Sequence, residues 1–218
     1  MADRWALRWG GISGILFVVL LIPGIFIGRP DIPEPGLSGQ EVHNYFSGWR
    51  TLFMVGNGVS FIFAAFFFLW FLGILRNVLR STEGEGEWLS TVALSGGLMF
   101  ITLELAGAAA EIAYPAALAR FANFQPDAQL AFLSLALSGW LYNFAWVGLS
   151  VLIAATSALA LWIRRLPRWL GWAGFVFAVL ALSKFLTPLA HTVALLWVLV
   201  VSALMLAGRV SFSRRATT

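Results

Sequence analysis

Three charged residues fall inside strongly apolar stretches, where they are the side chains best placed to do chemistry. Glu104, Glu111 and Lys184 each lie in a run otherwise dominated by Ala, Leu, Phe and other apolar residues. In a membrane helix each such charge costs roughly 2.5–3.5 kcal/mol, so it marks a functional site by default. A carboxylate there can accept a proton or bind a cation, and Lys184 can neutralise it.

The depth of these charges follows from the helical rise. We place Trp88 and Trp169 at the inner edge of a hydrocarbon layer ~30 Å thick and count outward at about 1.5 Å per residue. Glu104 then lies about 9 Å above the midplane and Lys184 about 7.5 Å above it. Glu111, two turns further on the same helix face, reaches about 19 Å, at headgroup level. We therefore expect Glu104 and Lys184 to meet in the outer half of the membrane.

Other polar and aromatic residues fall near this layer. Asn57, Asn143 and His191 are candidates to complete a ligand or proton site, and Trp140, Tyr142 and Trp146 are candidate pocket aromatics. The small residues of segment 106–110, between the two glutamates, leave room for a ligand or for a close neighbouring helix. The phenylalanine-rich run 61–71 can line a pocket, although its composition favours contact with lipid.

Each of these features has a structural alternative. Lys184 can stretch to the outer headgroups, and its pair with Glu104 can serve only to hold two helices in register. Glu111 and the asparagines are typical of a membrane boundary, and His191 near Pro188 is typical of a helix cap. With two histidines and no cysteine, we expect no metal site and no cofactor. No catalytic motif is present, so we assign no catalytic residue.

The composition indicates a membrane protein. Of the 218 residues, 60% are hydrophobic and 11% are charged, whereas soluble domains average about half and about a quarter. This excludes an ordinary soluble enzyme, a disordered chain and a nucleic-acid binder. Membrane lipids are the expected partners, together with a hydrophobic small molecule, and the composition is compatible with a homo-oligomer.

About six apolar stretches are long enough for membrane helices of about 20 residues. They are residues 9–28, 52–75, 88–112, 143–163, 169–186 and 192–207. Most of the 14 Lys and Arg residues and most boundary tryptophans fall on one side of this arrangement. The positive-inside rule therefore predicts that both termini are cytoplasmic. The sequence predicts an all-α, multi-pass transmembrane helix bundle, a single domain over 1–218, in the plasma (inner) membrane, with the first span retained rather than cleaved as a signal peptide.

Two outer connections, 29–51 and 113–142, are longer than the inner ones. The first is rich in proline and then in aromatic residues, and the second opens with Pro115. Residues 130–163 would extend about 51 Å as one helix, so their first part should project outward or lie in the interface. The apolar stretch 169–208 is too long for one span, so we expect a turn near Thr187 and Pro188.

Several short segments resemble a motif of small six-span bacterial integral membrane proteins of unknown function. These segments are LPRWLGW at 166–172, AATS at 154–157 and LWFLG at 69–73. The resemblance implies a six-span layout across most of the chain. It implies no reaction, cofactor or functional residue.

We expect an outward-facing polar pocket inside the membrane, between the third, fourth and fifth spans, that binds or moves a small hydrophobic or amphiphilic molecule, with proton coupling through Glu104. Two alternatives stay open at this point. One is an intramembrane enzyme that acts on an isoprenoid or lipid substrate with Glu104 as the acid. The other is a non-catalytic accessory or structural membrane subunit.

Overall fold

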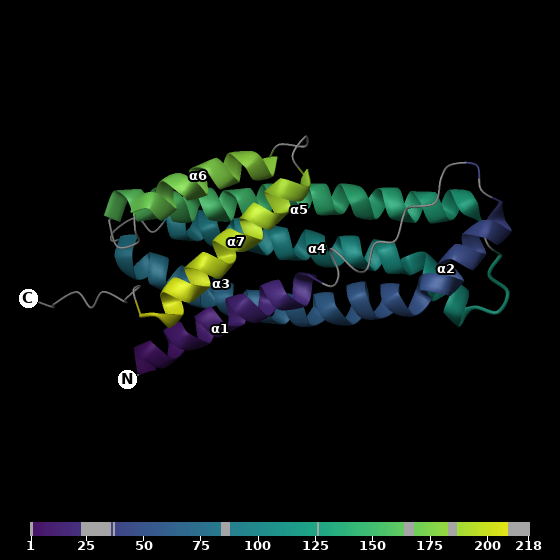
Figure 1. Cartoon of the computed structure of the whole chain (residues 1–218), viewed down its shortest axis with the longest axis horizontal. Coiled ribbons are helices and arrows are strands. Elements are labelled where there is room, and N and C mark those ends of the chain that lie inside the picture. Colours follow the sequence, from purple (N-terminus) through teal and green to yellow (C-terminus); the bar gives the residue numbers. More distant parts are fainter. Residues whose placement is uncertain are drawn as a thin grey trace, which may run out of the picture.

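The structure is a computed structural model that describes residues 2–22, 36, 38–83, 88–125, 127–163, 168–182 and 187–208. All regular elements in these ranges are helices (Figure 1). They are α1 (Ala2–Ile22), α2 (Gly39–Phe53), the π-helical segment η2 (Met54–Ser60), α3 (Phe61–Glu83), α4 (Trp88–Arg120), α5 (Ala128–Ile163), α6 (Arg168–Leu182) and α7 (Thr187–Leu206). The all-α prediction is confirmed for this part of the chain.

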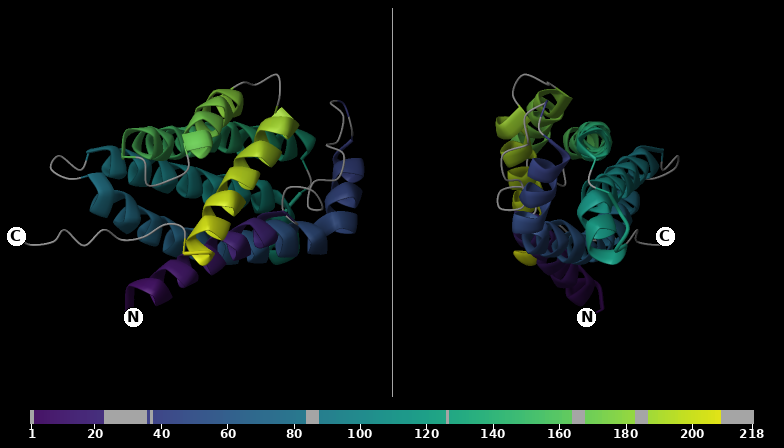
Figure 2. Two further views of the ribbon diagram at one scale, coloured as in Figure 1. Left: turned by 60° about the vertical axis from the view of Figure 1, so that its left-hand side comes forward. Right: turned by 90° about the vertical axis from the view of Figure 1, so that its right-hand side faces the viewer.

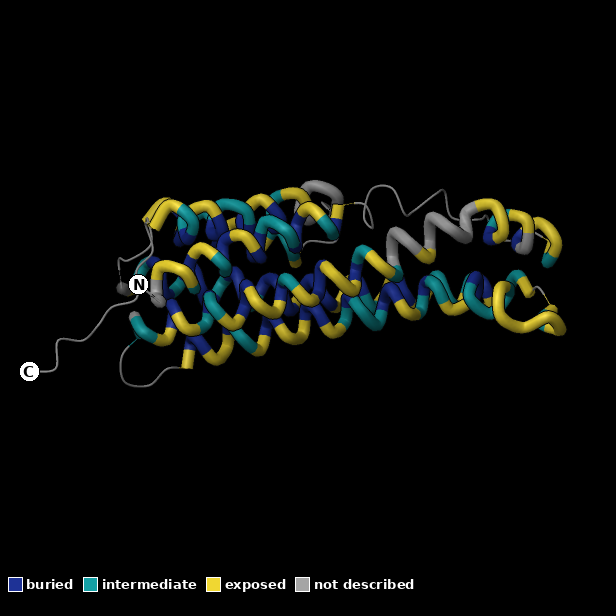
Figure 3. Tube along the Cα trace, turned by 90° about the horizontal axis from the view of Figure 1, so that it is seen from below, coloured by how far each residue is buried: buried dark blue, intermediate teal, exposed yellow. Residues whose placement is uncertain are grey.

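Six of the helices form a closed ring. Each helix packs on its neighbours in the order α1, α3, α4, α5, α6, α7 and back to α1, and the view along the bundle shows this arrangement (Figure 2). The start of α1 and the end of α7 lie at the same end of the bundle (Figure 1). Buried residues line the inside of the ring and exposed ones its outside (Figure 3).

Four helices in the described ranges are long and apolar enough to cross a membrane. Their apolar segments are Arg4–Ile22, Gly58–Ser81, Trp88–Arg120 and Ala128–Trp162, and two shorter apolar helical segments cover Arg168–Leu182 and Thr192–Leu206. The break expected in the last apolar stretch is confirmed, since α6 ends at Leu182 and α7 begins at Thr187.

The α4–α5 hairpin extends well beyond the other helices of the ring. With 33 and 36 residues, α4 and α5 are about 50 Å and 54 Å long, against ~30 Å for a hydrocarbon layer. Their far ends and α2 enclose a second, small core of Val42, Phe46, Tyr114 and Ala131. Much of what the sequence indicates as two outer connections is therefore helical.

Helix α4 continues through Pro115, where the sequence predicts the start of a connection. Proline removes one backbone hydrogen bond and normally bends or ends a helix. Here Pro115 is buried, and the preceding Tyr114 belongs to the second core. Tyr114 also accepts a 2.9 Å hydrogen bond from the backbone N–H of Asp127. Packing and this bond offset the loss, and the helix runs on to Arg120.

Acidic side chains cap three helix starts. Glu83 accepts hydrogen bonds from the N–H groups of Leu89 (2.6 Å) and Ser90 (2.9 Å) at the start of α4. Asp127 accepts one from Gln129 (2.7 Å) at the start of α5. At α2 a capping box joins Ser38 and Glu41, and the hydrogen bonds from Ser38 lower the pKa of Glu41.

Two glycines bring α4 and α5 into backbone contact. A Cβ atom on Gly148 would lie 2.6 Å from the carbonyl oxygen of Gly96, and one on Gly96 would lie 2.7 Å from the carbonyl oxygen of Gly148. Further along the hairpin, the Ser134 hydroxyl donates to the carbonyl oxygen of Ala110. Small residues at such crossings let membrane helices approach closely, and these two contacts fix the register of the hairpin.

We predict that Gly148→Ala destabilises the protein by about 1–3 kcal/mol, because the new methyl group must push the two backbones apart. The matched control is Gly139→Ala on the same helix, where an added Cβ meets no atom within 4 Å. The control should be neutral or stabilising by up to about 1 kcal/mol, since alanine favours the helix. Thermal unfolding in detergent measures both variants. Equal melting temperatures for the two would contradict the close packing.

Candidate functional site

The candidate site is built on one face of α4. Glu104 and Glu111 lie seven residues apart, which puts them on the same side of the helix and about 10 Å apart along its axis. Both are buried, with 3% and 4% of their surface exposed. A carboxyl group at such a position is costly unless it is neutralised or hydrogen-bonded, so its surroundings determine what it can do.

Tyr142 of α5 is a hydrogen-bond donor to Glu111. Its hydroxyl group donates to Oε2 of Glu111 over 2.8 Å, and both side chains are buried. Gly107, between the two glutamates, makes this approach possible, because a Cβ atom there would lie 2.8 Å from the Tyr142 ring. The small-residue segment of α4 thus accommodates an aromatic side chain of α5.

An aromatic cluster lies next to Glu104 along the bundle. Phe100, one turn before Glu104, packs on Trp146 of α5 with ring centres 5.8 Å apart. Phe100 also packs on Phe68 of α3 at 5.3 Å and on Phe17 of α1 at 6.2 Å. The cluster joins four helices of the ring, α1, α3, α4 and α5.

The position of Glu104 is bracketed by two contacts between α4 and α5. On the terminal side is the Phe100–Trp146 contact, and toward α2 is the close approach of Gly107 to Tyr142. Phe61 of α3 adds a third wall, with its ring centre 6.1 Å from that of Tyr142. Glu104 is therefore a buried residue of α4 that lies, along the helix, between two aromatic contacts with α5.

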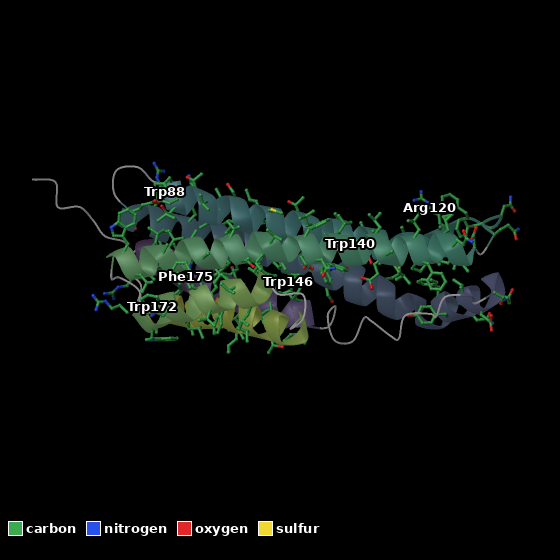
Figure 4. The ribbon with its side chains drawn as sticks, turned by 90° about the horizontal axis from the view of Figure 1, so that it is seen from above. Trp88, Arg120, Trp140, Trp146, Trp172 and Phe175 are labelled. Carbon is green, nitrogen blue, oxygen red and sulfur yellow. The ribbon has the colours of Figure 1, made fainter. Side chains whose placement is uncertain are left out.

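The structure does not bring the other predicted site residues together with the two glutamates. Asn143 is exposed, and Trp140, 52% exposed, packs on Phe144 at 5.8 Å on the outside of α5. Figure 4 shows Trp140 and Trp146 at different places along the helix. Lys184 and the side chains of Asn57 and His191 lie outside the described residues. The Glu104–Lys184 pair consequently stays a prediction.

The described aromatic contacts on either side of Glu104 form a wall of residues from α1, α3, α4 and α5. The pocket expected between the third, fourth and fifth spans stays a prediction. The phenylalanine run supplies part of this wall: Phe61 and Phe68 are buried, while Phe63 and Phe66 are exposed. Helical periodicity within the run would have indicated this division between interior and outside.

The arrangement can attract a proton or an organic cation. Carboxylate oxygens attract positive charge, and the faces of Trp, Tyr and Phe rings favour a cation further when water is excluded. Within the described ranges, no group of three or more acidic or histidine side chains is placed to hold a metal ion.

The chain was compared with known protein families, curated proteins and solved structures. No family model, curated protein or solved structure matches the chain.

We predict that Tyr142→Phe lowers the free energy of unfolding by about 1–3 kcal/mol, because it leaves the buried Glu111 carboxyl group without this donor. In a Glu111→Leu background the same change should cost much less, since the acceptor is already gone. Chemical or thermal unfolding of the four proteins in this double-mutant cycle measures the coupling. Additive effects would show that the hydrogen bond contributes nothing.

Proposed function

We propose that the chain is a plasma-membrane protein with six spans, α1, α3, α4, α5, α6 and α7, and with both termini in the cytoplasm. Large apolar side chains that are more than half exposed support the membrane setting: Ile62, Phe63 and Phe66 on α3 and Val176 and Val179 on α6. Such surfaces are unusual on a soluble protein and ordinary in lipid. The hairpin ends and α2 then project on the outer side.

Tryptophans support a membrane boundary at the end of the bundle where the chain termini lie. Trp5, Trp88, Trp162, Trp169 and Trp172 are each more than half exposed and belong to helix ends on the side of the chain termini. Figure 4 shows Trp88 and Trp172 at that end and Arg120 at the opposite end. A belt of exposed indole rings fits the headgroup level of a membrane.

The absence of cysteine makes the topology directly measurable. We predict that Asn123→Cys, beyond α4, reacts with a membrane-impermeant maleimide added to intact cells. Asn77→Cys, near the other end of the bundle and also exposed, should react only after permeabilisation. Labelling of both residues from outside, or of Asn77→Cys alone, would contradict the proposed orientation.

We further propose that the interior next to α4 binds or moves a small amphiphilic molecule that carries a positive charge. The observation that carries this proposal is the burial of Glu104 on α4 between the Phe100–Trp146 contact and the approach of Gly107 to Tyr142. In this scheme Glu104 exchanges a proton for the cation, Trp146 and Phe100 contact its apolar part, and the hydrogen-bonded Glu111 lies on the path toward the outside.

We predict that Glu104→Gln weakens binding of the lipophilic cation tetraphenylphosphonium at least tenfold and abolishes the proton release that accompanies binding. Glutamine keeps the size of the side chain and loses its charge. Isothermal titration in two buffers of different ionisation enthalpy measures affinity and proton release together.

The matched control is Glu41→Gln, an exposed change outside the proposed spans, which should bind like the wild type. Melting temperatures identify any variant that fails to fold, and Trp146→Leu then provides the second test of the same site. Wild-type affinity and proton release in a folded Glu104→Gln protein would remove Glu104 from the proposal.

A further inference from the structure

A second concave surface lies at the opposite end of the bundle from α2. A groove of about 390 Å³ opens between the first turns of α1 and the last turn of α7. Its lining is Arg4, Leu7, Arg8, Met205, Leu206, Ala207 and Gly208. None of these residues takes part in the site around Glu104 and Glu111, which we call the carboxylate site.

The groove has a charged side and an apolar side. Arg4 and Arg8 are exposed and lie one helical turn apart on α1, so both guanidinium groups can reach one ligand. Leu7 and Met205, at 6% and 0% exposure, form the apolar floor. Two arginines over an apolar floor suit a ligand with an anionic head and a hydrocarbon tail.

The backbone adds to this charge pattern. Helix α1 begins at Ala2, so the groove lies at the positive end of its dipole, where unpaired N–H groups favour an anion. At the end of α7, Gly208 takes a left-handed φ of 65°. There its N–H donates to the carbonyl oxygen of Met205 (3.2 Å), and the N–H of Ala207 donates to that of Ala203 (2.9 Å). Two carbonyl oxygens at the negative end of α7 therefore already have hydrogen-bond donors from the same segment of chain.

Aromatic residues set the level of the groove in the membrane. Trp5 and Trp9 stack with ring centres 6.3 Å apart, and Trp70 of α3 packs edge-on against Trp9 at 6.5 Å. Trp5 is 70% exposed. Indole rings in such a cluster favour the headgroup region, which brings the adjacent arginines to the height of lipid phosphates.

We propose that this groove binds the phosphate headgroup of an anionic phospholipid, with Arg4 and Arg8 on the phosphate and the start of an acyl chain on Leu7 and Met205. A guanidinium group can donate two parallel hydrogen bonds to two oxygens of one phosphate, and it keeps its charge at every physiological pH. This proposal rests on the proposed membrane location of the chain. It does not depend on the proposed role of Glu104.

The same arginines have an alternative role, because a positive charge near the C-terminal end of α7 also stabilises that helix. The two roles differ in what they predict for lipid binding. A purely structural role lowers the melting temperature of an arginine variant to the same extent in anionic and in zwitterionic lipid.

The experiment compares the wild type with Arg4→Gln/Arg8→Gln and with Arg80→Gln/Arg168→Gln. The second double variant removes the same charge from exposed positions on α3 and α6, outside the groove lining. Each protein in uncharged detergent is titrated with phosphatidylglycerol, phosphatidylcholine and glycerol 3-phosphate. Native mass spectrometry counts the bound molecules, and thermal unfolding is recorded in parallel.

We expect phosphatidylglycerol to bind the wild type and the control alike, and the groove variant more weakly by about fivefold for each arginine removed. Phosphatidylcholine and glycerol 3-phosphate should bind all three proteins weakly. Arg4→Lys/Arg8→Lys, which keeps the charge, should give an intermediate affinity and serves as the test if the glutamine variant does not fold.

Three results would overturn the proposal. One is equal phosphatidylglycerol affinity in the groove variant and the control. Another is glycerol 3-phosphate binding as tightly as the lipid, which would assign the groove to free phosphate esters. The third is a lowered melting temperature with unchanged lipid affinity, which would assign the arginines to α7.

Discussion

A carboxyl group buried among apolar helices needs a proton, a cation or hydrogen-bond donors, and α4 carries two such groups on one face. The surrounding structure answers this requirement for Glu111 with the hydroxyl group of Tyr142. Near Glu104 along α4 lies the aromatic contact of Phe100 with Trp146. Our proposal that Glu104 exchanges charge depends on its burial beside this contact, and the hydrogen bond from Tyr142 is the reason to give Glu111 a fixed, supporting position.

The close approach of α4 and α5 makes this arrangement possible. Backbone contact at Gly96 and Gly148 fixes the register of the hairpin, and the same register places the Tyr142 ring against Gly107. A larger residue at either crossing would shift the phenol away from Glu111. The Gly96–Gly148 packing and the Tyr142–Glu111 hydrogen bond therefore depend on each other. The second core, which α2 forms with the far ends of α4 and α5, holds the other end of the hairpin together.

Amphipathic and apolar patterns predict the helices well, since the break near Thr187 and the long helix after Asp127 follow from length alone. These patterns do not predict that α2 joins a second core or that α4 continues through Pro115, because both depend on tertiary contacts to Tyr114 that no local pattern contains.

The two glutamates stand out in the sequence as charges among apolar residues. Their partners do not, because Phe17, Phe68 and Phe100 look like ordinary apolar residues until the fold brings them together. Asn143 and Trp140 are exposed on α5, whereas Tyr142 and Trp146 of the same helix are buried, and the apolar composition of this stretch does not distinguish the two faces.

The most direct test of the central claim is an experimental density map of the protein with tetraphenylphosphonium bound in a lipid nanodisc. The account predicts density for the cation between α4 and α5, in contact with the Glu104 carboxylate and the Trp146 ring, with the Tyr142–Glu111 hydrogen bond still formed. Density for the cation elsewhere, with Glu104 enclosed by protein alone, would contradict the account.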